Sequence, residues 1–144
     1  MRIISDTTCH LSKEEASSSG VRLVANQVMI GETTYKDYLD IDSGHFIDLI
    51  KTQHPQTSQP SAGDIMMAYE ESTDEALHIT TGRGLSSAFD TACGVKKSMD
   101  IDYVTVFDSQ SVAGVNRYLT QLAARLRDKY DLETVINRFR LSTK

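Results

Sequence analysis

The sequence has only two cysteines and no long apolar run. Cys9 and Cys93 show neither a CxxC pattern nor a metal-binding spacing to histidine, so neither a disulfide framework nor a metal site is expected. No window approaches the roughly 18 uninterrupted apolar residues of a membrane span, and the first residues do not resemble a signal peptide. We therefore expect no integral membrane segment and a cytoplasmic location.

The sequence also lacks an excess of basic residues. Fifteen Lys and Arg residues stand against twenty Asp and Glu residues, and the net charge is −5. The basic residues are scattered along the chain, whereas a nucleic-acid surface needs cations gathered opposite the phosphates. Nucleic acid and anionic membrane are therefore poor partners for this chain.

Hydrophobic residues make up 40% of the 144 residues, enough to bury a core without disulfides or a metal. Short apolar runs predict strands at 1–5, 21–25, 28–35, 76–81 and 103–107, the third of which is either one strand or a hairpin. Helices are predicted at 43–50, 61–69, 85–95, 119–126 and 132–139, the first two capped by Ser43 and Ser61. Strands that alternate with helices indicate a single-domain α/β layered fold with a mainly parallel sheet flanked by helices.

Ser- and Thr-rich segments follow three of the predicted strands, at 6–8, 80–87 and 108–111. A fourth such segment, 57–61, is expected to be a loop that joins two helices. Because the carboxyl ends of parallel strands meet at one edge of a sheet, the first three loops should gather there. Their hydroxyl and N–H groups suit an anion that needs binding without proton transfer. The alternative is that these Ser and Thr residues are ordinary helix caps and turn residues. We prefer this interpretation for Ser111, and also for Ser43 at the start of the first predicted helix.

Thr57-Ser-Gln-Pro-Ser61 resembles the TSQPS signature of the DegV family. Asp6-Thr-Thr8 and Tyr35-Lys-Asp37 precede it and are similar to the family's Asp-Ser-Thr and Tyr-x-Asp. Gly84-Leu-Ser-Ser87 and Phe107-Asp-Ser109 follow it, in the places of Leu-Ser-Gly-Thr and Ile-Asp-Ser. These ordered matches span nearly the whole chain, so residues 1–144 resemble the N-terminal, lipid-binding domain of the family.

This resemblance implies a fatty-acid carrier without catalytic residues of its own, whose only ligand is a long-chain fatty acid that it presents to a fatty acid kinase. By the same resemblance, Thr57 and Ser86 hold the carboxylate while the acyl chain is buried. Their expected neighbours in the head-group site are Ser58, Gln59, Ser61, Gly84 and Ser87. Residues that would contribute less directly are Asp6, Thr7, Arg83, Asp108 and Ser109.

The sequence departs from the family pattern in two respects. Ser87-Ala88 stands where the family usually has Gly-Thr, which adds a side chain and removes a hydroxyl. The second domain that normally follows is absent, and we expect an isolated domain cut from a longer protein. Such a half would expose apolar surface and could self-associate.

A second interpretation is a phosphocarrier or phosphate-binding α/β domain. His10 follows the first strand, where an imidazole can act as a nucleophile toward phosphate, and Gly82-Arg-Gly84 would supply the anion loop. The simpler interpretation is that His10 is an exposed loop residue without a chemical role. A serine hydrolase is disfavoured, because the sequence has no Gly-x-Ser-x-Gly elbow.

Overall fold

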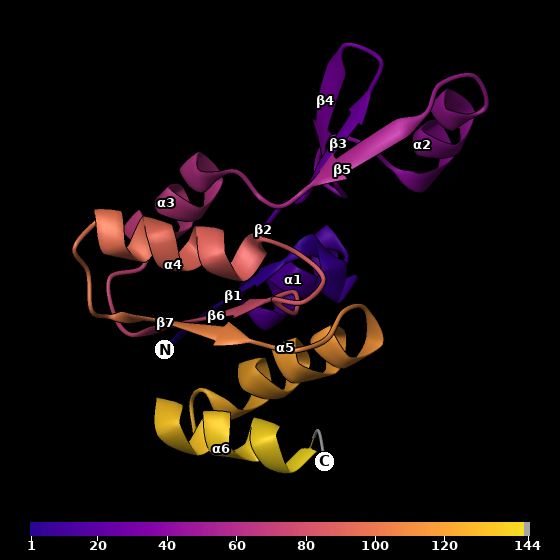
Figure 1. The fold of residues 1–144 in the computed structure, drawn as a ribbon. Coiled ribbons are helices and arrows are strands. Elements are labelled where there is room, and N and C mark those ends of the chain that lie inside the picture. Colours follow the sequence, from indigo (N-terminus) through magenta and orange to yellow (C-terminus); the bar gives the residue numbers. More distant parts are fainter. Residues whose placement is uncertain (143–144) are drawn as a thin grey trace.

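The structure, a computed structural model, describes residues 1–142 (Figure 1). The strands are β1 (Arg2–Asp6), β2 (Val21–Val24), β3 (Gln27–Ile30), β4 (Thr33–Lys36), β5 (Pro55–Ser58), β6 (Ala76–Thr80) and β7 (Val104–Asp108). The helices are η1 (Thr7–Cys9, a 3-10 turn), α1 (Lys13–Ser19), α2 (Ser43–Ile50), α3 (Ala62–Glu70), α4 (Ala88–Ser98), α5 (Gly114–Leu126) and α6 (Leu132–Ser142).

The strands form two sheets. Four parallel strands make the main sheet in the order β2-β1-β6-β7, and three antiparallel strands make a smaller sheet in the order β4-β3-β5. The predicted α/β fold with a mainly parallel sheet is thus confirmed. Of the two possibilities for residues 28–35, the structure has the hairpin, which is formed by β3 and β4.

The main sheet is covered by helices on both faces (Figure 1). Neighbouring residues of a strand point to opposite faces, so Ile3 packs with α1, α5 and α6 while Ile4 packs with α3 and α4. Phe139 and Tyr69 are the largest fully buried side chains of the two faces. Both cores are close-packed, so the sheet is a rigid platform for the loops at its edge.

The small sheet and α2 project from one end of this platform (Figure 1). Val28, Ile30 and Ile41 are its buried core, and Phe46 and Leu49 of α2 pack against them. This lobe comes from residues between the first two strands of the platform and α3. It therefore stands beside the carboxyl edge of the main sheet.

Several local predictions differ from the structure. The cap of α2 is Asp42, whose carboxylate accepts from the His45 N–H at 2.9 Å, so the predicted Ser43 cap is wrong. The cap at Ser61 is confirmed, because its hydroxyl accepts from the Asp64 N–H at 3.1 Å.

The segment 57–61, which was predicted to be a loop between two helices, is partly a strand, since Thr57 and Ser58 end β5. Leu85 precedes α4 and is 67% exposed, so it is not part of that helix's buried face.

Both cysteines are free, and Cys9 is buried while Cys93 is half-buried. Among the helices of residues 1–142, none combines the length and the apolar character that crossing a bilayer requires.

Candidate functional site

The loop after β1 and the loop after β6 are joined by the carboxylate of Asp6, which is fully buried. One of its oxygens accepts from the N–H and the hydroxyl of Thr81 at 2.6 and 2.9 Å. The other accepts from the N–H of Thr8 at 3.1 Å and from the Thr8 hydroxyl. Hydrogen bonds to an ionised acceptor are the strong ones, so Asp6 fixes the distance between the two loops.

The loop after β7 is held against the loop after β6 in the same way. The N–H of Gly82 donates to the Ser111 carbonyl at 2.8 Å, and a Cβ at position 82 would lie 2.6 Å from the Ser111 nitrogen. Only glycine therefore fits at 82. Asp108 accepts from the N–H of Arg83 at 3.0 Å, which completes the link. The three predicted loops do gather at one edge of the sheet.

A polar hollow of about 400 Å³ opens at this edge, and we call it the outer hollow. It is lined by five of the predicted head-group residues, Thr57, Ser58, Gln59, Ser86 and Ser87. The remaining lining residues are Thr8, Asn26, Thr81, Leu85 and Val112. Because it lies between β5 of the small sheet and the start of α4, residues far apart in the sequence meet there.

Ser86 has a hydroxyl suited to donating into the outer hollow. Its oxygen accepts from the Ala88 N–H at 3.1 Å, which directs a lone pair toward the first turn of α4 and leaves the O–H proton for another acceptor. The hollow thus faces the amino end of α4, where helix N–H groups favour negative charge. None of the residues that line it is Lys, Arg or His, so its donors are neutral.

The other predicted site residues lie outside the outer hollow. Arg83 and Gly84 are exposed, and the Arg83 guanidinium pairs with Asp90 at 3.0 Å. Ser61 is occupied as the cap of α3. The remaining predicted residues, Asp6, Thr7, Asp108 and Ser109, hydrogen-bond to other parts of the loops and line no hollow here. They shape the site without facing it.

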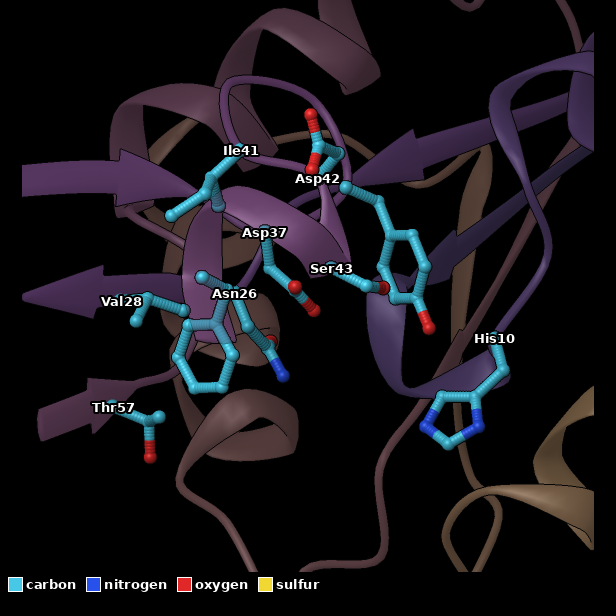
Figure 2. A pocket seen from close by; sticks show the side chains of 10 residues that line it. His10, Asn26, Val28, Asp37, Ile41, Asp42, Ser43 and Thr57 are labelled. Atoms are coloured by element: carbon cyan, nitrogen blue, oxygen red, sulfur yellow. The ribbon is translucent and has the colours of Figure 1, made fainter. Parts of the chain in front are cut away.

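A second hollow, of about 380 Å³, lies between the small sheet and α2, and we call it the inner hollow (Figure 2). One wall is apolar and consists of Val28, Ile41 and Phe46. Polar residues that line the hollow include His10, Asp37, Tyr38, Asp42 and Ser43. Sequence patterns single out His10 and Asp37 but do not bring them together, because the residues that line this hollow come from separate segments that meet only in the folded lobe.

Asn26 and Thr57 line both hollows. These two residues therefore stand between the two spaces, and we call this place the neck. In Figure 2 the side chain of Asn26 lies between those of Thr57 and Asp37. Asn26 was not among the predicted site residues, since it belongs to no motif and lies in the short link between β2 and β3.

Asp37 is a half-buried carboxyl group on the inner hollow. Burial raises its pKa above the ordinary value, while hydrogen bonds with Thr7 and with the Tyr38 backbone and the charge of His10 lower it. His10 and Tyr38 both have left-handed backbones, with φ of 53° and 60°, and their rings lie 6.3 Å apart. Non-glycine residues in this conformation are uncommon and concentrate at functional sites.

The structure separates the two parts of the phosphate-binding alternative. His10 is exposed and lines the inner hollow, whereas residues 82–84 line neither hollow. Within residues 1–142, no group of three or more His, Cys, Asp or Glu side chains is placed to hold a metal ion.

Comparison with known protein families gives a match over residues 1–140 to the model of the DegV family, described as "Uncharacterised protein, DegV family". A DegV domain-containing protein of Staphylococcus aureus strain MRSA252 is 30% identical over 141 residues, which are 94% of this chain and 50% of the relative. Protein DegV of Bacillus subtilis strain 168 is 29% identical over 113 residues, 75% of this chain and 40% of that protein. The chain thus spans half or less of the length of these relatives.

Two solved structures have the same fold as this chain, and more than a quarter of their aligned residues are identical to it. The crystal structure of DegV from Bacillus subtilis, described as a fatty acid binding protein, has a TM-score of 0.87 and 26% identity, and the match covers 96% of this chain and 52% of that one. A DegV family protein from Thermus thermophilus, described by its fatty acid binding, has a TM-score of 0.83 and 26% identity, with coverage of 97% and 52%.

Proposed function

Because the chain belongs to the DegV family, we propose that it binds a long-chain fatty acid, with the carboxylate in the outer hollow and the acyl chain in the inner hollow. The observation that carries the proposal is the neck, where a hydroxyl-lined space and a partly apolar space share Asn26 and Thr57. The fatty-acid binding described for the DegV structures from Bacillus subtilis and Thermus thermophilus supports it.

The inner hollow supplies the apolar contacts for the acyl chain. Val28 and Ile41 belong to the buried core of the small lobe, and Phe46 packs against them from α2. Burial of each methylene contributes about 0.8 kcal/mol, so a long chain binds tightly through such contacts alone. The two cores of the main sheet have no comparable role, since their side chains are already close-packed.

The outer hollow supplies the hydrogen bonds that the carboxylate needs. A carboxylate moved out of water without partners loses several kcal/mol. The hydroxyls of Thr57, Ser86 and Ser87 offset this loss, and the amino end of α4 adds a favourable field. This arrangement binds a head group, but it contains no paired acid and base that would transform it.

We also propose that the protein is a carrier whose bound carboxylate is offered to a fatty acid kinase. The kinase is inferred from the family resemblance, and the exposure of Thr57 supports access from outside. In this arrangement the head group lies at the open end of the site and the tail lies in the lobe. No catalytic residue of this chain is required.

Native mass spectrometry of the purified protein, followed by organic extraction, tests the proposal. We expect one fatty acid per chain. Thr57→Ala should weaken fatty-acid binding about tenfold or more, since one hydrogen bond to a charged group is lost. Thr33→Ala on the exposed β4 strand is the matched control and should bind normally. An empty protein that takes up phosphate on His10 would instead support the phosphate-binding alternative.

A further inference from the structure

We propose that the side-chain amide of Asn26 is a further ligand-binding group, which donates a hydrogen bond to the head-group carboxylate at the neck. This inference rests on the proposed fatty-acid function and adds a binding residue to it. Asn26 lines both hollows together with Thr57, so its side chain can reach a ligand that occupies either space.

The backbone of Asn26 is held on both sides. Its N–H donates to the buried Thr7 hydroxyl at 3.0 Å, and its carbonyl accepts from the Asp37 N–H at 2.9 Å. The first bond ties Asn26 to the turn after β1, and the second ties it to the end of the hairpin. The side chain therefore starts from a fixed point, and little backbone freedom remains to be lost when a ligand binds.

The side-chain amide itself is uncommitted. Within residues 1–142 it makes no hydrogen bond, although the residue is half-buried. A primary amide carries two N–H donors and a carbonyl acceptor, and covering them with an acyl chain alone would cost free energy. A ligand that places a polar head beside Asn26 meets this need, because the carboxylate accepts what the amide donates.

The surrounding charges favour an amide over an acid at this position. Asp37 and Asp42 line the inner hollow, where His10 and Tyr38 are the other titratable groups, and no Lys, Arg or His lines the outer hollow. A ligand carboxylate is therefore repelled from the inner hollow and is held on the outer side of the neck. Asn26 stands at this boundary between Thr57 and Asp37, where it can donate without adding negative charge (Figure 2).

The test measures the binding of two ligands of equal chain length, hexadecanoic acid and hexadecanol, to three variants of the full chain. Asn26→Asp keeps the shape and adds a negative charge, so it should weaken the acid about 30-fold or more and the alcohol less than about threefold. Asn26→Leu should weaken the acid about tenfold. Asn137→Asp makes the same change at an exposed residue of α6, far from both hollows, so it is the control and should change neither affinity by more than about twofold.

Circular dichroism and the melting temperature establish that each variant is folded. Equal losses for the acid and the alcohol would indicate a merely structural role for Asn26 and would overturn the inference alone. Unchanged affinities in both Asn26 variants would do the same, while leaving the fatty-acid function standing. If the wild-type chain binds no fatty acid, the proposed function and this inference both fail.

Discussion

The buried carboxylate of Asp6 accepts two hydrogen bonds from Thr81, one from its N–H at 2.6 Å and one from its hydroxyl at 2.9 Å. Asp6 ends β1 and Thr81 directly follows the neighbouring parallel strand β6, and the two residues are 75 positions apart in the sequence. This contact places Thr8 and Thr81 side by side on the outer hollow, with their hydroxyl oxygens 2.6 Å apart. The shape of the proposed head-group site therefore depends on a residue that does not line it.

Asp6→Ala should destabilise the protein strongly, because it leaves four donors of Thr8 and Thr81 without their shared acceptor. We expect the free energy of unfolding to fall by about 3 kcal/mol in urea denaturation. Asp108→Ala is the matched control at the next strand end, where the accepted bonds are exposed, and should cost about 1 kcal/mol. Equal losses in the two variants would remove the special role of Asp6.

Phe46→Ala should weaken long-chain fatty-acid binding about tenfold, because it removes the aromatic part of the apolar wall. Ile47→Ala changes the adjacent residue of α2, which is 54% exposed and lines no hollow here, and should bind like the wild type. Titration with acids of decreasing chain length measures both. The Phe46→Ala defect should shrink as the chain shortens, and a defect that is independent of length would place the tail elsewhere.

His78 makes stability depend on pH. It is fully buried in β6, and burial lowers its pKa from 6.5 to about 3, while its Nδ1 is 2.7 Å from the Tyr69 hydroxyl. Below pH 6.5 the unfolded chain binds a proton that the folded chain does not, so this group removes stability as the pH falls from 6.5 toward 3. The loss approaches about 1.4 kcal/mol per pH unit.

Unfolding in urea between pH 7 and pH 4 measures this slope. His78→Gln keeps a polar partner for Tyr69 but does not titrate, so its stability should depend less steeply on pH. His54→Gln is the control, because His54 is exposed, and it should keep the wild-type slope. The assignment to His78 is contradicted if all three proteins lose stability in parallel.

The sequence predicts the main sheet well because its strands are apolar and its loops carry recognisable turn residues. Ile3, Ile4, Leu77 and Ile79 lie in short runs bounded by polar segments, and a buried parallel strand requires that pattern. The gathering of the loops follows from the parallel arrangement alone. The resemblance of residues 57–61 and 84–87 to the family motifs then points to five residues that do line one hollow.

The lobe is harder to predict because tertiary contacts decide it. Thr57 and Ser58 have no apolar pattern of their own, yet they form a strand because β3 offers backbone partners, with Val28 opposite Thr57. Asp42 and Ser43 are both good capping residues, and the sequence does not distinguish them. Asn26 carries no motif, and its place at the neck arises only when β2, the hairpin and β5 come together.

Photo-crosslinking with a fatty acid that carries a diazirine at its methyl end tests the orientation of the ligand most directly. After irradiation and digestion, we predict adducts on the peptides that contain Val28, Ile41 and Phe46, which line the inner hollow. The adducts should disappear when an excess of unlabelled fatty acid competes. Adducts on α3, α4 or α6 instead would contradict a tail bound between the small sheet and α2.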